Sequence, residues 1–407
     1  MSSRRVAVIG AGASGLVAAR ELRREGHIPV VLERAAAIGG TWRYDAGADP
    51  LGAGGAHSSV YASLRINSSR ECMGFRNFPF VAGTEGDPRR FPGHGEVLRY
   101  LEEFARRFDL HGLVRLQTEV VSVRRRVDDA GVPGWSVSYC SRKLAGVGNK
   151  VEEEVFDAVV VCNGHFTEPR LADIAGIDGW PGKQMHSHNY RVPDPFHGQV
   201  VVVVGYRSSG FDISREIAGF AREVHVAIAR YLQLIPRIKR AEEDGGVVFQ
   251  GGTRVKADVI IHCTGRYKYN YPFLSDEDSV ISVDDNPVGP LYKHVFPQHL
   301  APRISFIGLP FKGILFSEMM RDVALFYSEL EACGCPKRYT HDLGGGTMYE
   351  YDDWLAEQCG QEGIGGWRKA MYIAARKNVV NRPGSYRDEW DDSHLLPQAH
   401  QEFTKYF

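Results

Sequence analysis

Three glycines near the N-terminus have the spacing of a dinucleotide-binding turn. Gly10, Gly12 and Gly15 in "GAGASG" fit the pattern G-x-G-x-x-G, after a strand-like run and before a helix-like run. The first glycine permits a tight turn, the second lets a pyrophosphate approach the backbone, and the third lets the helix pack on the strand. Glu33 ends the next strand, where its carboxylate can accept a hydrogen bond from an adenosine ribose hydroxyl. We therefore predict a dinucleotide site here; the alternative is a glycine turn that holds no ligand.

A second copy of this turn stands at "GYRSSG", and its middle position is an arginine. Gly205 and Gly210 keep the outer glycines, whereas Arg207 replaces the middle one. A side chain at that position obstructs the close approach of a ligand, although a guanidinium can itself bind phosphate. The following strand ends near Arg230 and has no carboxylate, which favours NADP over NAD. The alternatives are a copy that has lost its nucleotide and an Arg230 that is only a surface charge.

Two dinucleotide domains in one chain imply that a hydride passes between two cofactors. One of them should be a flavin, because a pair of nicotinamides has no route to one-electron or oxygen chemistry. A flavin enzyme that reduces disulfides needs a redox pair such as C-x-x-C. Cys333 and Cys335 in "EACGCPKR" are too close together for that motif, so we exclude a disulfide reductase.

The segment "WPGKQMHSHNY" at 180–190 carries two histidines that could suggest a metal site. Zinc would need His186, His188 and a third ligand such as His165 or His197. Cysteine or carboxylate partners at defined spacing are not evident, and neither is a serine or cysteine nucleophile. We predict that this segment binds no metal and is a linker between the two nucleotide domains.

The elements around these motifs form two copies of one β-α-β pattern. Residues 5–33 read as strand, glycine turn, helix and strand, and the same order returns from residue 199. The pattern predicts an α/β fold with two doubly wound, Rossmann-like dinucleotide-binding domains, the NADPH domain inserted into the FAD domain. The expected parts are 1–175 for the first part of the FAD-binding domain, 176–265 for the NADPH-binding domain with its linkers, and 266–407 for the second part of the FAD-binding domain and a C-terminal helical region.

The composition limits the partners and the compartment. The 407 residues include 49 basic and 50 acidic side chains, so a net charge of -1 gives no reason to expect nucleic acid or an anionic membrane surface as partner. The apolar runs are too short to span a bilayer, and the N-terminus has no signal-peptide pattern. Seven scattered cysteines, an odd number, are typical of a reducing compartment. We expect a cytoplasmic protein without a stable membrane anchor.

Several motifs together carry a resemblance to a known family. Trp180, Gly182, His186 and Tyr190 match the signature F-x-G-x-x-x-H-x-x-x-Y of flavin-containing monooxygenases, with Trp in place of Phe. The surrounding motifs are "GGTW" at 39–42, "SLRINSSRECMGFRNFPF" at 63–80, "VVVCNGHFTEPRL" at 159–171, "CTGRYKYNYPFL" at 263–274 and "YRDEWDD" at 386–392. Over nearly its whole length the chain resembles the plant S-oxygenating, glucosinolate S-oxygenase-like subgroup of that family.

The resemblance implies a reaction and a set of site residues. NADPH reduces FAD, the reduced flavin captures O₂ as a C4a-hydroperoxide, and bound NADP⁺ shields it until a thioether sulfur or an amine nitrogen attacks. Asn67 matches the family's asparagine beside the flavin ring, and we expect it to be catalytic. The residues expected to hold the cofactors are Gly10, Gly12, Ser14, Gly15, Glu33, Gly40, Thr41, Trp42, Asn67, Gly205, Arg207, Ser208, Ser209, Gly210 and Arg230.

The resemblance favours S-oxygenation of a small thioether, and it leaves alternatives. An N-oxygenase acting on amines and an auxin-pathway monooxygenase acting on an indole keto acid are the nearest ones. A Baeyer–Villiger enzyme is disfavoured, because Tyr190 and Arg191 stand where its signature has Trp-Pro. Two regions, after Arg230 and after Gly313, are shorter than is usual in the family, and Arg266 interrupts its T-G-Y run. These departures allow a third reading, an FAD-binding homologue with weak or uncoupled NADPH oxidase activity. The sequence predicts no oligomeric state.

Overall fold

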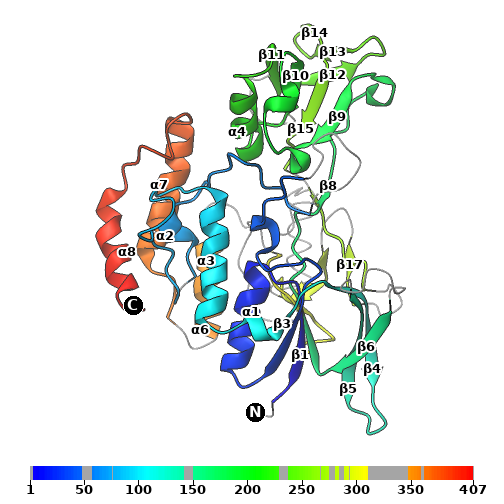
Figure 1. Cartoon of the computed structure of the whole chain (residues 1–407), viewed down its shortest axis with the longest axis vertical. Helices are drawn as coiled ribbons and strands as arrows, with labels where there is room; N and C mark the ends of the chain where they lie inside the picture. Colours follow the sequence, from blue (N-terminus) through cyan, green and yellow to red (C-terminus); the bar gives the residue numbers. More distant parts are fainter. Residues whose placement is uncertain are drawn as a thin grey trace. The chain divides into compact units, whose positions relative to one another are not determined.

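The chain divides into two compact units, which we describe one at a time. Unit 1 contains Met1–Gly40, Arg65–Gly164 and Tyr269–Phe407, and unit 2 contains Thr41–Leu64 and His165–Lys268 (Figure 1). The segment Thr41–Leu64 thus belongs to unit 2, whereas the expected boundaries placed it in the first domain. The computed structural model describes residues 3–47, 57–75, 77–141, 150–228, 237–265, 267–274, 280–283, 288–292, 294–309, 347–358 and 362–406. The expected assignment of one cofactor to each domain stays a prediction.

A parallel sheet forms the centre of unit 1. Its order is β21-β7-β1-β2-β3, with β1 (Arg5–Ile9), β2 (Ile28–Leu32), β3 (Val114–Arg115), β7 (Ala158–Val161) and β21 (Ile304–Phe306) all parallel. Helix α1 (Ala13–Arg24) connects β1 to β2 and buries Leu16 and Ala19, and helix α3 (His94–Arg107) precedes β3. The strands β1, β2 and β7 at the centre of the sheet are almost entirely apolar, as expected for parallel strands that are covered on both faces.

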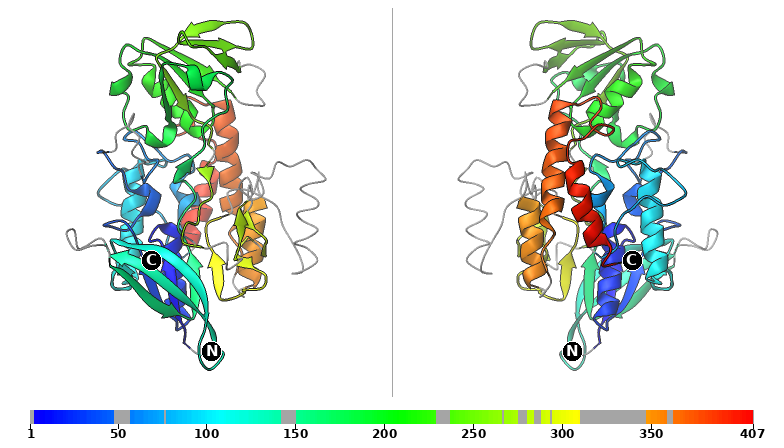
Figure 2. Two further views of the ribbon diagram at one scale, coloured as in Figure 1. Left: turned by 90° about the vertical axis from the view of Figure 1, so that its right-hand side faces the viewer. Right: turned by 90° about the vertical axis from the view of Figure 1, so that its left-hand side faces the viewer.

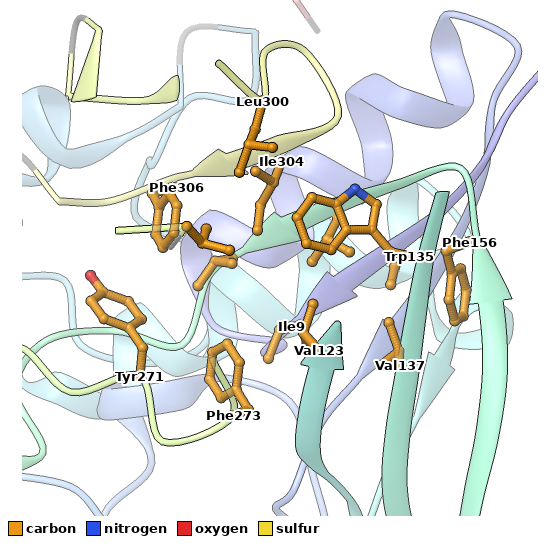
Figure 3. Close-up of a cluster of buried hydrophobic side chains, with 14 of the residues drawn as sticks. Ile9, Val123, Trp135, Val137, Phe156, Tyr271, Phe273, Leu300, Ile304 and Phe306 are labelled. Atoms are coloured by element: carbon orange, nitrogen blue, oxygen red, sulfur yellow. The ribbon is translucent and has the colours of Figure 1, made fainter. Parts of the chain in front are cut away.

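An antiparallel sheet packs its apolar face into the core of unit 1. It consists of β4 (Thr118–Val127), β5 (Pro133–Ser141) and β6 (Val151–Phe156). Every second residue of the central part of β5 is buried, as expected for a strand with one solvated face. Figure 3 shows Trp135 and Val137 of β5 in one cluster with Ile9, Ile304 and Phe306 of the parallel sheet.

Three helices lie near the C-terminus among the described residues of unit 1. They are α6 (Thr347–Gln358), α7 (Gly366–Asn381) and α8 (Leu396–Phe403), and they are drawn in orange to red in Figure 2. Helix α7 packs on the short helix α2 (Arg70–Met73) and on α8, where Met371, Ala399 and Phe403 are buried. The described residues of this region agree with the expected helical region.

The motif "YRDEWDD" is held by a buried ion cluster. Arg90 binds Asp392 through both terminal nitrogens, and Arg90 Nε donates to Glu71 Oε2 at 3.2 Å. The side chains of Arg90 and Asp392 are only 5% and 4% exposed. In the same motif Asp388 pairs with Arg65 at 2.8 Å but is 60% exposed. The same short motif therefore contains one buried and one exposed ion pair.

Unit 2 repeats the parallel arrangement around a run of five valines. The sheet order is β11-β10-β15-β9, with β9 (Lys183–His186), β10 (Val200–Val204), β11 (Glu223–Ala227) and β15 (Val259–His262) all parallel. Val201 and Val203 face the side covered by helix α4 (Ser208–Ile217), and the alternate valines face the opposite side. That opposite side is covered by β12 (Ile238–Ala241), β13 (Gly246–Phe249) and β14 (Arg254–Lys256).

The two parallel sheets confirm the predicted α/β class with two doubly wound halves. In each unit the strand before the glycine turn lies between the strand that follows the helix and a later strand. The shorter elements are the strands Glu168–Pro169, Tyr267–Lys268, Ser282–Val283, Val288–Gly289, Leu291–Tyr292 and Phe296–Pro297, and the 3-10 turns Gly40–Trp42, His111–Leu113, Ile177–Gly179, Ser187–Asn189, Asp194–Phe196 and Ser393–Leu395. No helix within the described ranges has the length and apolar character needed to cross a membrane.

Because one ion pair of the C-terminal motif is buried and the other is exposed, removing their aspartates should lower the free energy of unfolding by different amounts. We expect Asp392→Ala to lower the free energy of unfolding by about 3 kcal/mol, because it leaves Arg90 buried without its main counter-charge. Asp388→Ala, the matched control, should cost less than about 1 kcal/mol, because its pair is exposed. Urea denaturation followed by tryptophan fluorescence measures both. Equal losses for the two variants would contradict the assignment of the buried cluster as the main anchor.

Candidate functional site

The outer glycines of the first turn are required by the fold itself. Gly10 has φ +102°, and a Cβ there would lie 2.5 Å from the carbonyl oxygen of Cys162. A Cβ on Gly15 would lie 1.9 Å from the carbonyl oxygen of Gly10. No side chain fits at such distances, so these two glycines allow α1 to start directly against the end of β1.

Gly12 differs from its neighbours, because the fold leaves room for a side chain there. Its φ of -78° is ordinary, and a Cβ would meet Gly40 Cα at 3.6 Å, a normal contact. Gly12 is also the N-cap of α1 and makes no side-chain cap, so amides of the first turn are left for an external acceptor. A glycine at this position is explained by the approach of a ligand such as a pyrophosphate, which fits the predicted dinucleotide.

Glu33 fixes the turn in addition to its expected role toward a ribose. Its side chain lies in unit 1 and is 5% exposed. Oε2 accepts from Ala11 N at 2.7 Å, and Oε1 accepts from Ala35 N at 2.7 Å. A carboxylate has about four acceptor positions, so about two remain, and one of them can take a ligand hydroxyl. The contact with Ala11 was not foreseen from the sequence.

Gly39 and Gly40 of the motif "GGTW" pack against the first turn. Gly39 N donates to Ala11 O at 3.0 Å, and a Cβ on Gly40 would lie 2.9 Å from Gly12 Cα. The structure therefore brings Gly40 together with Gly10, Gly12 and Glu33.

The other residues expected around the flavin are found in both units. Ser14 is half-buried, and its Oγ would lie 2.7 Å from a Cβ on Gly308. Thr41 and Trp42 follow Gly40 in a 3-10 turn and belong to unit 2. Asn67 is exposed on the bend before α2 in unit 1. The expected roles of Asn67, Thr41 and Trp42 stay predictions.

The second turn repeats the contacts of the first. Gly205 has φ +109°, and its Cβ would lie 2.3 Å from Cys263 O, while a Cβ on Gly210 would lie 1.9 Å from Gly205 O. Arg207 is the N-cap of α4 with φ -87° and ψ -168°, almost the backbone conformation of Gly12 at -78° and -171°. Positions 12 and 207 are therefore equivalent.

The side chain of Arg207 extends into solvent beside the start of α4. It is exposed and makes no capping hydrogen bond. Ser208 and Ser209 are the first residues of the helix. A cation beside a helix N-terminus adds favourable charge for a phosphate. Arg230, also expected here, lies outside the described residues, as do Arg266, residues 231–236 of the short region after Arg230, and the region after Gly313.

Part of the histidine segment forms a strand in the sheet of unit 2, which the prediction of a linker between the two nucleotide domains did not include. Residues 183–186 form β9, which pairs with β15 and places His186 beside His262. Trp180 is buried on one face of the sheet. A Cβ on Gly182 would lie only 2.3 Å from the Trp180 ring. Tyr190 is buried on the other face, and its hydroxyl donates to Glu216 at 2.8 Å. This strand was not predicted because "KQMH" is short and three of its four residues are polar.

Burial keeps both sheet histidines neutral. His186 Nδ1 accepts from His188 N at 3.0 Å, and His262 Nδ1 accepts from Ala172 N at 3.1 Å. Burial, followed by the effects of His188 and His262, lowers the pKa of His186 to about 3. Burial lowers the pKa of His262 to about 4. Among the residues that the structure describes, no group of three or more His, Cys, Asp or Glu side chains could hold a metal ion.

Arg191 is a buried organising residue that sequence reasoning did not single out. Its guanidinium donates to Asp45 O and Ser58 O of the segment Thr41–Leu64, at 2.9 and 2.6 Å. It also donates to His188 O and Tyr190 O, at 2.9 and 2.8 Å. The only sequence signal was a basic residue directly after the signature tyrosine. Arg191 thus joins the chain that follows Trp42 to the signature segment.

Comparison with known proteins identifies relatives over the whole length. A sequence profile of the family "Flavin-binding monooxygenase-like" matches residues 3–240 and 226–319. "Flavin-containing monooxygenase FMO GS-OX-like 3" of Arabidopsis thaliana is 48% identical over 99% of this chain and 98% of that protein. The solved structure of S-allyl-L-cysteine S-oxygenase from Allium sativum is 48% identical, covers 99% of both chains and has a TM-score of 0.90. Tmm from a Pelagibacter strain, 22% identical with a TM-score of 0.76, shares the fold.

The contrast between Gly12 and Gly15 predicts two different defects. Gly12→Ala should keep the melting temperature of the FAD-free protein, because its Cβ meets nothing closer than 3.6 Å, yet bind FAD at least about tenfold more weakly. Gly15→Ala should destabilise the FAD-free protein, because its Cβ overlaps Gly10 O. Circular dichroism melting and FAD titration separate the two effects. A Gly12→Ala variant that binds FAD like the parent would refute the first site.

The neutral histidines predict acid sensitivity of unit 2. Their pKa values in the folded chain are below the usual 6.5, so the unfolded chain binds more protons as the pH falls below that value. Stability should therefore decrease from about pH 6.5 toward about pH 4. His262→Asn keeps an acceptor for Ala172 N but cannot titrate, and should flatten this decrease. Denaturation midpoints measured at several pH values test this prediction. If the midpoint falls with decreasing pH as steeply in the variant as in the parent, the prediction is wrong.

Proposed function

The chain belongs to the flavin-containing monooxygenase family, and from that premise we propose that it transfers one oxygen atom of O₂ to the sulfur of a small thioether. Membership confirms the expected enzyme class, a flavin-dependent monooxygenase, and the expected cofactors, FAD and NADPH. The proposal adds the atom that is oxygenated and the class of substrate.

One observation carries the choice of sulfur. The chain is similar, over nearly the whole of both chains, to an enzyme named for the S-oxygenation of S-allyl-L-cysteine. The Arabidopsis relatives of similar identity carry the GS-OX name. This agreement over the full length supports a thioether before an amine or an indole keto acid.

The protein's own residues bind and orient the two nucleotides. When bound, FAD supplies the chemistry that activates O₂ after NADPH has reduced it. Gly12 and the first-turn amides of α1 would hold the pyrophosphate of FAD, while Glu33 keeps the turn in shape and would accept a hydrogen bond from the ribose. Arg207 and Ser209 at the start of α4 hold phosphate groups of NADPH.

The remaining proposed roles concern the reacting end of the site. Asn67 would hold the nicotinamide nucleotide, because its side-chain amide can both donate and accept hydrogen bonds. Arg191 binds two backbone carbonyls of the segment that follows Thr41 and Trp42 and two of the signature segment, which helps to keep Thr41 and Trp42 in place. Residues that position cofactors and exclude water, without an acid–base pair, suit a reaction in which the cofactor carries the oxidant.

A second candidate function is an NADPH oxidase that releases H₂O₂. The observation that favours it is the side chain of Arg207 at the position equivalent to Gly12, which narrows the approach of a second nucleotide. If the nicotinamide nucleotide were bound in the wrong position, water could reach the reduced flavin. The products distinguish the two functions.

The test is an absorbance spectrum of the purified protein, followed by a single-turnover reaction with NADPH, air and a sulfide. We expect the purified protein to be yellow, to bleach with NADPH under anaerobic conditions, and to form methyl p-tolyl sulfoxide when air and the sulfide are added. Trimethylamine and indole pyruvate serve as competing substrates in the same assay. Faster oxygenation of either competitor would contradict the choice of sulfur.

Other results would locate a defect. Bleaching with H₂O₂ as the sole product would establish the oxidase instead. A yellow protein that NADPH does not bleach would place the fault in the second turn, where Arg207→Gly is the variant to compare.

A further inference from the structure

The loop of residues 57–64, which we call the strap, is packed against helix α4 in unit 2. Ser58, Val60 and Tyr61 of the strap are only 1%, 3% and 4% exposed. Tyr61 lies in the same buried cluster as Ile213 of α4. Connecting loops usually run over the surface, so this degree of burial is unusual. The strap is therefore a packed part of unit 2.

Two side-chain hydrogen bonds join the strap to α4. Tyr61 OH donates to Asp212 Oδ2 at 3.0 Å, and Ser63 Oγ donates to Glu216 Oε2 at 2.8 Å. Asp212 and Glu216 lie about one helical turn apart, so they share one face of α4. Hydrogen bonds to an ionised carboxylate are stronger than those between neutral groups. The two bonds therefore fix the strap along this face.

The strap also contacts a residue that is expected to hold the flavin. Ser58 Oγ donates to the backbone oxygen of Thr41. Arg191 donates to Ser58 O at 2.6 Å and to Asp45 O at 2.9 Å, and Ala62 N donates to Arg191 O at 2.9 Å. Thr41 is thus connected to α4 through the strap. Every contact of this path lies within unit 2.

The two ends of this path are the regions expected to hold the two cofactors. Thr41 and Trp42 are expected to hold FAD, whereas Ser208 and Ser209, at the start of α4, are expected to hold NADPH. Reaction between two bound groups requires that the reacting atoms come to about 3–3.5 Å, and a misplacement of ~1 Å can slow it about 100-fold. A fixed path between the two regions should therefore affect the rate of hydride transfer.

Contact with the nucleotide itself does not explain the carboxylates of this path. Asp212 and Glu216 follow the first turn of α4, and their negative charges would repel a phosphate. A role in stability alone is the alternative explanation. In that case, loss of the bond between Tyr61 and Asp212 would lower the melting temperature and leave the rate of hydride transfer unchanged.

We propose that Tyr61 and Asp212 are positioning residues for hydride transfer, because their hydrogen bond holds the strap, and with it Thr41, in a fixed place relative to α4. A hydride, which carries two electrons, leaves NADPH and is accepted by FAD, so that NADP⁺ and reduced FAD are the products. The inference rests on the cofactor sites of the proposed function. Neither residue is expected to touch a reacting atom, so the pair affects the rate of transfer and not the affinity for NADPH.

Anaerobic stopped-flow absorbance of the full-length, FAD-loaded protein separates the limiting rate of flavin reduction from the Kd for NADPH. Tyr61→Phe and Asp212→Ala should each lower the limiting rate at least about fivefold and keep the Kd within about twofold. A parent-like limiting rate in both variants, or a change in the Kd alone, would overturn the inference. A parent that NADPH does not reduce would instead contradict the proposed function.

Two further variants serve as controls. Asp212→Asn keeps an oxygen that can accept from Tyr61 OH, so its limiting rate should stay within about twofold of the parent. Equal slowing by Asp212→Asn and Asp212→Ala would overturn the role of the hydrogen bond. Tyr139→Phe is the matched control, because Tyr139 of unit 1 is 4% exposed and its hydroxyl donates to Glu154. A similar loss of rate in Tyr139→Phe would show that the effect is not specific to the strap.

Hydrogen exchange tests the strap without any flavin reaction. In the full-length protein without added cofactors, the Ala62 amide should be protected, because it donates to Arg191 O. Peptides that contain Ala62 should exchange at least about fivefold faster in Tyr61→Phe than in the parent, because the strap opens more often. Tyr139→Phe should exchange in these peptides like the parent. Parent-like exchange in Tyr61→Phe would show that this bond does not hold the strap, and the inference would be wrong.

Discussion

The close packing of a helix start against a strand end is the constraint on which both nucleotide turns depend. In each unit a glycine of the helix lies so near the carbonyl of the turn's first glycine that its Cβ would overlap that oxygen at 1.9 Å. This contact is possible only without a side chain, and it brings the free amides of the helix to the carboxyl end of the parallel sheet. That edge is where ligands bind in doubly wound folds. Gly15 and Gly210 make the same contact, so the two turns share one backbone arrangement.

The two turns differ at their middle position, where the fold itself does not require a glycine. At Gly12 the protein would accept a side chain, so the glycine is explained by what approaches from outside. At the equivalent Arg207 a side chain is present, and it extends into solvent. The two turns therefore have the same backbone but different ligand surfaces, one neutral and open, the other cationic. This difference is consistent with two different dinucleotides in one chain.

Local patterns predicted much of the fold, and long-range contacts account for what was missed. The β-α-β halves and their glycines were predicted because the signal lies in adjacent residues, such as the valines of β10 before Gly205. Strand β9 was missed because it is an edge strand whose partner, β15, is far away in sequence. The bonds of Arg191 to Asp45 and Ser58 have no local signal either.

The central claim is that this chain places one atom of O₂ on a thioether sulfur. The most direct measurement is the mass of the sulfoxide formed from methyl p-tolyl sulfide, NADPH and ¹⁸O₂ in ordinary water. The account predicts a sulfoxide that carries the heavy isotope, in about equal amount to the NADPH oxidised. A sulfoxide with oxygen from water, or consumption of NADPH without any sulfoxide, would contradict it.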